Sequence, residues 1–215
     1  MVWQIRDLID TPLINKTLSY YKEEYFVSGA VSNPDKVRKN NLMMDPRPPY
    51  PEIAQEISHT IVHNDDIRSI FLVKYLSQVQ LLWYKEDMYY NYHVDAFPIG
   101  GVNAHMSVSI FLNDDYEGGE LVIKPGGVEV SFKPKPGDAI IYDTGLWHKV
   151  NPVTKGERKV IVGWMECMIP ESFMRKHCIE YGYAVKDMCE SKRVSDEDLN
   201  TLEQLRMNLI REYIR

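Results

Sequence analysis

The chain has 215 residues, of which 44% are hydrophobic, and a formal net charge of −6 at pH 7. This composition indicates a folded globular protein and disfavours both extensive disorder and a nucleic-acid partner. The sequence has no run near the roughly 20 apolar residues that span a bilayer, no secretory signal at its start and no C-x-x-C pair among its three cysteines, so we expect a cytoplasmic protein with reduced thiols and no membrane partner.

Residues 1–76 are expected to form a mostly helical support for the core. Thr11 and Pro12 suit a helix start, because a hydroxyl can cap free backbone amides and a proline ring already has the helical φ. A helix is therefore predicted over Leu13–Tyr25. A proline-rich loop separates it from a second predicted helix, Glu52–His63, whose isoleucines fall on one stripe.

Residues 77–168 differ in character from the preceding segment. Short runs of Val, Ile, Tyr and Phe are separated by turns rich in Gly, Pro and Asp, and no helical crossover lies between them. Such spacing predicts a mainly β fold with flanking helices, and a sandwich or jelly roll rather than a parallel sheet. The predicted strands are Gln78–Tyr84, Met106–Leu112, Glu120–Ile123, Val128–Phe132, Ala139–Tyr142 and Lys159–Trp164.

Residues 169–215 return to a helical pattern. Ser195 and Asp198 have the spacing of a capping box, and an apolar stripe follows them at Leu199, Leu202, Leu205, Leu209 and Tyr213. This stripe suits a helix packed on the outside of the sheet, with a dimerisation helix as the alternative. Because no clear linker divides the chain, we predict a single domain over residues 1–215, either monomeric or homodimeric.

Two H-x-D triplets are candidates for metal binding. The first, His63-Asn64-Asp65, lies at the end of a predicted helix, four residues after His59. That spacing can hold a metal ion, but the segment H-T-I-V-H lacks the glutamate that a zinc protease uses as its base. We therefore interpret these histidines as surface or helix-end residues.

The second triplet, His93-Val94-Asp95, lies in a strand-like segment, where residues two apart point to the same face. His148 is the leading candidate for a third ligand, because it follows the predicted strand Ala139–Tyr142. Two histidines and one carboxylate leave coordination positions open, an arrangement that suits iron(II) and oxygen activation. Arg158 begins the next predicted strand and can bind a carboxylate with its guanidinium fork.

Several segments resemble the prolyl 4-hydroxylase family, and in particular the bacterial PKHD-type hydroxylases related to it. Residues 84–95, Y-K-E-D-M-Y-Y-N-Y-H-V-D, are similar to the pattern Y-x-x-G-x-x-Y-x-x-H-x-D, with Asp87 in place of the glycine. The likeness is firm from about residue 78 to 168 and has a weaker echo, K-V-R-K-N-N, at residues 36–41. Two further matching segments are F-L-N-D-D-Y-E-G-G-E-L at 111–121 and P-G-D-A-I-I-Y-D-T-G-L-W-H-K-V-N-P-V-T-K-G-E-R at 136–158.

The resemblance implies a fold and a set of site residues. The expected core is a double-stranded β-helix over residues 77–168, with the flanking helices before and after it. The expected metal and catalytic residues are His93, Asp95 and His148. The expected residues of the 2-oxoglutarate site are Arg158 for the distal carboxylate, Tyr84 as its hydrogen-bond partner, and Tyr90 and Trp164 as nearby aromatic side chains.

The resemblance also implies an activity. Such enzymes use iron(II), O2 and 2-oxoglutarate to hydroxylate an unactivated C–H bond, with release of succinate and CO2 and with ascorbate as a candidate reductant. Asp95 favours hydroxylation, because related halogenases lack this carboxylate so that chloride can bind. A peptidyl proline or similar residue is the favoured target, while free amino acids and other small molecules stay open as substrates.

Three other interpretations remain at this stage. A cupin-type metal-binding protein or isomerase without 2-oxoglutarate turnover would explain the likeness of Gly137–Asn151 to a cupin motif, but it gives Arg158 no task. A nucleic-acid demethylase of the AlkB type would carry a second arginine where this chain has Trp164. A jelly-roll protein without catalysis would leave the polar triad unexplained.

Overall fold

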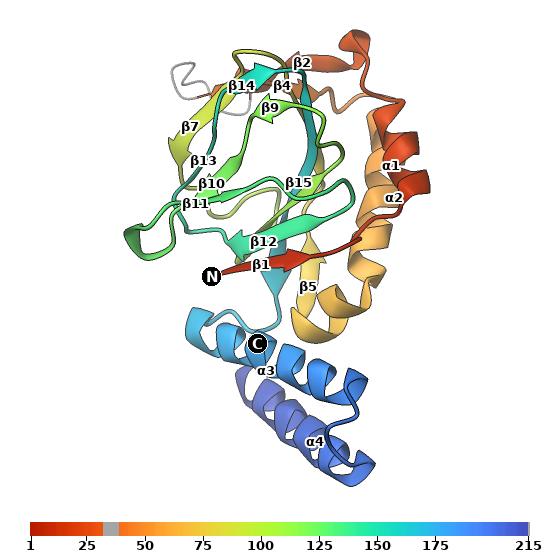
Figure 1. Cartoon of the computed structure of the whole chain (residues 1–215), viewed down its shortest axis with the longest axis vertical. Helices are drawn as coiled ribbons and strands as arrows, with labels where there is room; N and C mark the ends of the chain where they lie inside the picture. The colour runs from red at the N-terminus through yellow and green to blue at the C-terminus, as the bar shows by residue number, and fades with distance from the viewer. Residues whose placement is uncertain (32–38, 215) are drawn as a thin grey trace.

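Two antiparallel sheets pack face to face in the computed structural model, which describes residues 1–31 and 39–214 (Figure 1). The larger sheet has the strand order β1 (Val2–Ile5), β12 (Ala139–Asp143), β8 (Met106–Phe111), β15 (Arg158–Cys167), β6 (Gln80–Tyr84), β4 (Leu42–Met44) and β2 (Phe26–Ser28), and β5 (Val73–Leu76) also pairs with β15. The smaller sheet has the order β11 (Val130–Phe132), β10 (Leu121–Ile123), β13 (His148–Val150), β7 (Tyr89–His93) and β3 (Lys39–Asn40). A separate ribbon pairs β9 (Glu117–Gly118) with β14 (Val153–Lys155).

The larger sheet is buried on both faces, and its alternating side chains divide between two apolar clusters. In β8, Val108 and Ile110 belong to the cluster shared with the helices, whereas Phe111 belongs to the cluster between the sheets. Successive residues of a strand point to opposite faces, so one strand supplies both clusters. The same alternation turns Ser107 and Ser109 toward the space between the sheets, where they line a cavity.

Helices α1 (Thr11–Leu18) and α2 (Tyr50–His63) cover the outer face of the larger sheet. The isoleucine stripe predicted for the second helix is confirmed, because Ile53, Ile57 and Ile61 are all buried against the sheet. Removing one such side chain from water contributes about 1.5–3 kcal/mol to stability. This layer therefore stabilises the sheet from the side opposite the cavity.

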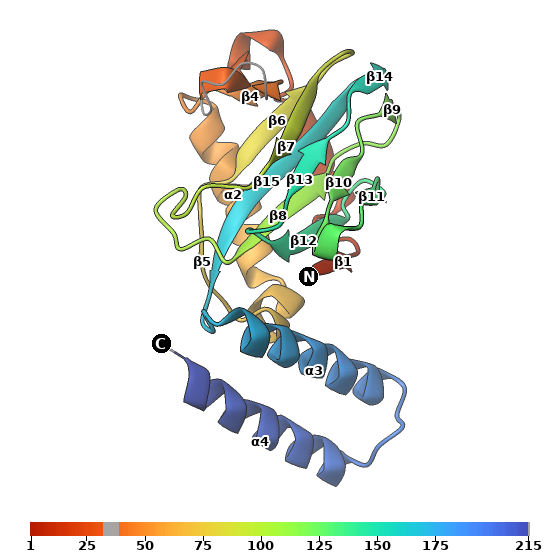
Figure 2. The same cartoon turned by 90° about the vertical axis from the view of Figure 1, so that its left-hand side faces the viewer.

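The C-terminal helices α3 (Ser172–Glu190) and α4 (Asp196–Tyr213) form an antiparallel pair that projects from one end of the sheets (Figure 2). The predicted cap at Ser195 is confirmed, since its hydroxyl accepts a hydrogen bond from the Asp198 amide at 3.1 Å. Helix α4 packs on α3, burying Arg206 and Ile210, rather than on the sheet as the sequence suggested. Leu209, from the predicted stripe, stays exposed.

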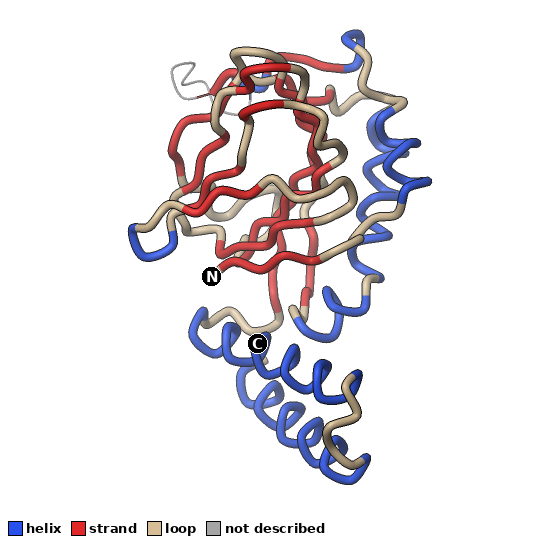
Figure 3. Tube along the Cα trace, viewed as in Figure 1, coloured by secondary structure: helices blue, strands red, loops and turns tan. Residues whose placement is uncertain are grey.

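Residues 1–76 contain the strands β1 to β5 as well as helices, so this segment is less helical than the sequence suggested (Figure 3). Helix α1 is shorter than the predicted Leu13–Tyr25 and ends at Leu18. Its N-cap is Asp10 rather than Thr11, and the Asp10 carboxylate accepts a hydrogen bond from the Leu13 amide at 2.9 Å. Between these strands lie the short helical segments η1 (Glu23–Tyr25), η2 (Gly29–Val31) and η3 (Asp66–Ile70).

The strands predicted over residues 77–168 are confirmed, with small shifts at their ends. The exception is the metal-ligand segment, because β7 ends at His93 and Asp95 follows the strand. A short helix, η4 (Pro125–Gly127), joins β10 to β11. Among the described helices, none is long and apolar enough to cross a membrane.

The turn between β6 and β7 explains the glycine in the family pattern. Asp87 has a φ of 64°, in the left-handed region, and its amide donates to the Val153 carbonyl at 2.9 Å. Aspartate is among the few residues other than glycine that adopt this conformation at modest cost. Asp87 therefore preserves the turn that leads the chain into β7 and toward His93.

Candidate active site

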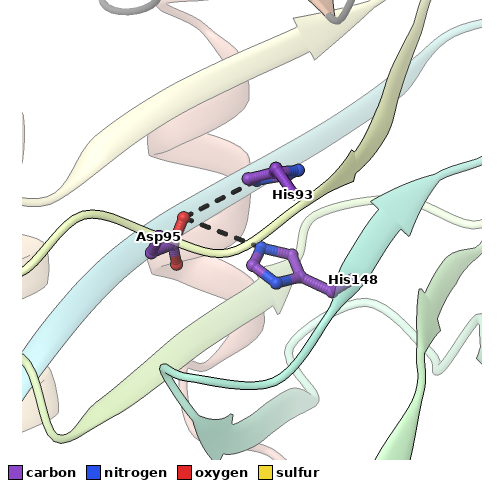
Figure 4. Close-up of side chains that lie close together, drawn as sticks. All are labelled: His93, Asp95 and His148. Atoms are coloured by element: carbon purple, nitrogen blue, oxygen red, sulfur yellow. Dashed lines mark ion pairs between the residues drawn. The ribbon is translucent and has the colours of Figure 1, made fainter. Parts of the chain in front are cut away.

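His93, Asp95 and His148 converge between the two sheets (Figure 4). His93 ends β7, and His148 begins β13 directly opposite it in the strand pairing. Asp95 lies just beyond β7, so its position comes from the loop that follows the strand rather than from strand alternation. The three residues reach one point because β7 and β13 are neighbours, although the second histidine lies 53 positions after Asp95 in the sequence.

The three side chains present lone pairs to a common centre. The Nε2 atoms of His93 and His148 lie 3.6 and 3.7 Å from Oδ1 of Asp95, and the candidate ligand atoms all lie within 4.8 Å of one another. Each imidazole Nδ1 faces a backbone carbonyl, that of Asn91 at 2.8 Å and that of Leu146 at 2.9 Å. Because a carbonyl only accepts, each Nδ1 carries the proton and each Nε2 is free to bind a metal ion.

The second oxygen of Asp95 is held by the larger sheet. Oδ2 accepts hydrogen bonds from Nε1 of Trp164 at 2.8 Å and from the Ser107 hydroxyl at 3.0 Å. The hydroxyls of Ser107 and Thr144 are also hydrogen-bonded to each other, with 3.1 Å between their oxygens. Since a carboxylate only accepts, Ser107 donates to Asp95 and receives its second bond from Thr144. These bonds leave Oδ1 directed at the two histidines.

Electrostatics keep the triad in the protonation states that metal binding needs. Burial alone raises the pKa of Asp95, but the neighbouring imidazoles of His93 and His148 and the hydrogen bond from Trp164 lower that pKa to about 2. Burial also lowers the pKa of His148. At neutral pH the carboxylate is therefore ionised and the His148 imidazole is neutral, as in metal sites.

The triad lies in a cavity of about 270 Å³. This volume is close to the lower end of the range of roughly 300–1,000 Å³ found for small-molecule sites. The cavity is lined by apolar side chains of both sheets and, among the described residues, by three charged groups that are not histidines: Lys39, Asp95 and Arg158. Its size and lining suit one or two small polar ligands next to a metal ion.

Arg158 is a buried cation without a carboxylate partner. Its side chain is 1% exposed and lines the cavity, and within the described part of the chain no carboxylate lies within 4.0 Å of its guanidinium. The guanidinium carbon lies 5.0 Å from the ring centroid of Tyr84 and 5.2 Å from that of Phe111. A buried guanidinium flanked by two rings is a receptor for an anion, because an unpaired buried charge is costly.

The remaining predicted site residues also line this cavity. Tyr84 pairs with Arg158 across β6 and β15, and burial raises its pKa to about 12, against the effect of the arginine. Tyr90 stacks on His93 with ring centroids 3.6 Å apart and an angle of 15° between the rings. Trp164 binds Asp95 rather than only flanking it. All seven predicted site residues are therefore brought together.

Sequence reasoning missed Ser107, Ser109 and Lys39, which the structure adds to the cavity. The two serines had a usable signal, because they alternate with apolar residues in Met106–Leu112 and so mark the polar face of a strand. For Lys39 the sequence gave no signal apart from the weak family likeness at residues 36–41. Residues 36–38 of that segment lie outside the described part of the chain.

The competing histidine pair lies elsewhere. His59 and His63 are exposed on α2, and their rings stack with centroids 3.9 Å apart. Nδ1 of His63 faces the His59 carbonyl at 2.8 Å, as expected for side chains on one helix face. Among the described residues, the three-residue cluster with metal-ligand geometry is that of His93, Asp95 and His148, so the first H-x-D triplet is not a metal site.

Comparison with known proteins gives the family. Residues 79–166 match the 2OG-Fe(II) oxygenase superfamily. A PKHD-type hydroxylase of Sphingopyxis alaskensis is 34% identical over 152 residues, which make up 68% of this chain and 70% of that relative. The chain belongs to the PKHD-type hydroxylases. It is therefore a dioxygenase of the family that uses iron(II) and 2-oxoglutarate, and the cupin-type and non-catalytic interpretations are set aside.

Two solved structures share the fold of this PKHD-type hydroxylase. A Pseudomonas putida prolyl-4-hydroxylase superposes with a TM-score of 0.56 at 17% identity, over 77% of this chain and 92% of that one. A Trichoplax adhaerens prolyl hydroxylase, solved with a peptide fragment of hypoxia inducible factor, gives 0.59 at 14% identity, over 76% and 82%. The predicted jelly-roll core with flanking helices is confirmed by these likenesses.

The residues present fit the cofactors of the family. A set of two imidazoles and one carboxylate with free lone pairs matches the ligand set of non-haem iron(II) oxygenases. The orphaned Nε of Arg158, buried in the same cavity, matches the need of a dicarboxylic cosubstrate for a cation. The PKHD-type hydroxylase can thus hold both groups in one cavity.

Proposed function

We propose that this enzyme hydroxylates an unactivated C–H bond of a peptidyl proline or similar residue, consuming O2 and 2-oxoglutarate and releasing succinate and CO2. In this proposal His93, Asp95 and His148 bind iron(II), and Arg158 binds the distal carboxylate of 2-oxoglutarate. One observation carries the proposal: a metal-capable triad and a buried guanidinium without a carboxylate partner line the same cavity of about 270 Å³.

When bound, iron(II) and 2-oxoglutarate supply the oxidising power that inserts one oxygen atom of O2 into the C–H bond. The protein binds these two groups and orients them relative to each other. Arg158 offers a forked donor that suits a carboxylate, and its position between two rings limits the directions in which it can point. Tyr84 stays protonated at neutral pH, given its raised pKa, and so can donate a second hydrogen bond to the same carboxylate.

Asp95 is proposed to bind the metal through Oδ1 alone. Trp164 and Ser107 both donate to Oδ2, which opposes rotation of the carboxylate toward two-oxygen coordination. Binding by one oxygen keeps more coordination positions for the cosubstrate and O2. Orientation of a ligand by such outer hydrogen bonds is a general feature of metal sites.

The substrate side of the cavity has an apolar wall. Val94, Ile99 and Val162 line it, and they suit the aliphatic ring of proline or a similar side chain. The Trichoplax prolyl hydroxylase, which shares the fold, was solved with a bound peptide, and this supports the proposal of a peptidyl target here. An apolar wall also excludes water from the C–H bond that is to be oxidised.

The further proposals concern the protein as a whole. We propose one oxygenase domain over residues 1–215, because β1 to β5 and the core strands share sheets and α1 and α2 share their apolar cluster. Ascorbate stays a predicted reductant. The cytoplasmic location and the choice between monomer and homodimer also stay predictions.

The test needs no substrate. The anaerobic apo-protein is titrated with iron(II) and then 2-oxoglutarate, and the weak visible charge-transfer band of the chelate is recorded. We expect the band in the wild type, its loss in Asp95→Ala, and a requirement for roughly 100-fold more 2-oxoglutarate in Arg158→Ala, because hydrogen bonds to a charged group are lost. Arg193→Ala, at an exposed arginine outside the cavity, serves as the control and keeps the wild-type titration.

Two results would contradict the proposal. Metal binding without any charge-transfer band would show that 2-oxoglutarate does not bind the metal in the cavity. An unchanged 2-oxoglutarate requirement in Arg158→Ala would show that Arg158 does not bind the cosubstrate.

A further inference from the structure

Asn41 is a buried polar residue at the point where the chain passes from one sheet to the other. β3 ends at Asn40 and pairs with β7 in the smaller sheet, whereas β4 begins at Leu42 and pairs with β6 in the larger sheet. Asn41 lies between these two strands and is 2% exposed. It is therefore enclosed at a junction of the two sheets that form the cavity.

The strand register places Asn41 beside Tyr84 and Arg158. Leu42 lies opposite Trp83 across β4 and β6, so Asn41 comes next to Tyr84 when the antiparallel pairing is continued by one residue. Tyr84 in turn lies opposite Arg158 across β6 and β15. An amide, a phenol and a guanidinium from adjacent segments of chain thus follow one another in a row.

The amide of Asn41 is unsatisfied among the described residues, because neither Nδ2 nor Oδ1 has a hydrogen-bond partner there. Free polar atoms are costly at a buried position, so this amide calls for an explanation. It nevertheless acts on Tyr84: burial raises the pKa of that phenol to about 12, while the charge of Arg158 and the side chain of Asn41 oppose the rise. An N–H group directed at the phenol oxygen has this effect, since it favours the ionised form.

Gly29 shapes the space around this amide. The Gly29 amide donates to the Asn41 carbonyl at 2.8 Å, and a Cβ atom added at Gly29 would lie 2.0 Å from Oδ1 of Asn41. A glycine therefore leaves the room that the Asn41 side chain occupies. Since Oδ1 packs on Gly29, the amide nitrogen remains for the Tyr84 hydroxyl.

We propose that Asn41 is a positioning residue for the cosubstrate: its amide N–H donates to the Tyr84 hydroxyl, and Tyr84 then directs its own proton at the distal carboxylate of 2-oxoglutarate. The inference rests on the function proposed above. A hydroxyl can accept one hydrogen bond while it donates another, so the bond from Asn41 fixes which way the phenol O–H points. Asn41 does not itself line the cavity and therefore acts through Tyr84.

The experiment compares two cosubstrates that differ only at the distal end. The anaerobic iron(II) complexes of the wild type and Asn41→Leu are titrated with 2-oxoglutarate and, separately, with 2-oxopentanoate, in which a methyl group replaces the distal carboxylate. The visible charge-transfer band measures binding without any turnover. Asn40→Leu is the matched control, because Asn40 is the same residue type one position earlier but is exposed.

We expect Asn41→Leu to require about 3-fold to 10-fold more 2-oxoglutarate than the wild type, which corresponds to the loss of one hydrogen bond. The titration with 2-oxopentanoate should stay within about twofold, because that ligand has no distal carboxylate for Tyr84 to bind. Asn40→Leu should match the wild type with both ligands. A merely structural role of Asn41 would shift both titrations together or neither of them.

A double variant tests whether Asn41 acts through Tyr84. Tyr84→Phe removes the hydroxyl that accepts the proposed hydrogen bond, so adding Asn41→Leu to it should change the 2-oxoglutarate requirement by less than about twofold. Coupling of this kind is expected only for residues that share one interaction. A further loss in the double variant, equal to that of Asn41→Leu alone, would show that Asn41 acts without Tyr84 and would overturn the inference.

Two other outcomes overturn it: an unchanged 2-oxoglutarate requirement in Asn41→Leu, and an equal loss for both ligands. A normal band with either outcome defeats this inference alone, whereas a missing band in the wild type defeats the proposed function as well. If Asn41→Leu does not fold, Gly29→Ala provides a second route. Its added Cβ displaces the amide without removing it, and the same selective loss of 2-oxoglutarate binding should follow.

Discussion

The two faces of the larger sheet come from the same strands but differ in chemistry. On the outer face, Trp83 of β6 and Ile161 of β15 pack with α1 and α2 in an apolar cluster. On the inner face, Tyr84, Arg158 and Trp164, from the alternate positions, line the cavity. The comparison shows that one residue of strand register separates side chains that stabilise the fold from side chains that bind ligands. Variants on the inner face should therefore change ligand affinity, whereas variants on the outer face should change the free energy of unfolding.

The largest expected effect is on the inner side of the sheets. His148→Ala should lower iron(II) affinity by roughly 100-fold or more, because even residues that only orient metal ligands alter affinity by about 10-fold to 100-fold. Metal content after dialysis against a weak chelator measures the change. His63→Ala is the control, since His63 belongs to the other H-x-D triplet and is exposed on α2. Equal iron loss in the two variants would contradict the assignment of the triad.

The helix-facing side should show the opposite pattern. Ile57 is fully buried between α2 and the sheet, so Ile57→Ala should lower the free energy of unfolding by about 2–5 kcal/mol. Iron(II) affinity of the folded protein should not change. Urea unfolding of the metal-free protein gives the stability, and Val128→Ala at an exposed position provides the reference, with an effect within about 0.5 kcal/mol. A loss of iron affinity in folded Ile57→Ala would show that the two faces are coupled.

A pair of tryptophans sharpens the comparison within one sheet. Trp164→Phe keeps an aromatic ring but removes the hydrogen bond to Oδ2 of Asp95, so iron(II) affinity should fall by roughly 10-fold. Trp83→Phe is the matched control, because Nε1 of Trp83 has no hydrogen-bond partner among the described residues. Competition with a chromophoric chelator measures both affinities. Equal affinities in the two variants would rule out a positioning role for Trp164.

The smallest expected effect is at the cap of α1, which does not line the cavity. Asp10→Ala removes the cap of α1 and should lower the free energy of unfolding by about 1 kcal/mol. Thr11→Ala should have the smaller effect, since Thr11 is the first residue of the helix rather than its cap. Thermal unfolding of the two variants under identical conditions decides between these positions. A larger loss of stability in Thr11→Ala than in Asp10→Ala would show that Thr11 is the cap, as the sequence suggested.

Prediction from sequence succeeded where the local pattern was strong. Strands β6, β8, β10, β11, β12 and β15 have β-branched and aromatic runs between clear turn residues, and the predictions found them within a few residues, whereas the short strands β9, β13 and β14 were not predicted. Strands β1 to β5 were missed because they are short and gain their stability from pairing with distant partners, as β1 does with β12. Their sequences carry little of that information, since strand propensity depends on what the strand packs against.

The sequence by itself determined the chemical parts of this protein. It supplied the two imidazoles, the carboxylate and the guanidinium, the alternation that divides each strand between two faces, and the family likeness. Only the tertiary structure decided which parts meet. The pairing of β13 with β7 places His148 opposite His93, while His63 in an identical H-x-D pattern stays exposed on a helix. The pairing of β3 with β7 brings Lys39 into the cavity. Such contacts arise from strand partners far apart along the chain, which residue spacing alone does not specify.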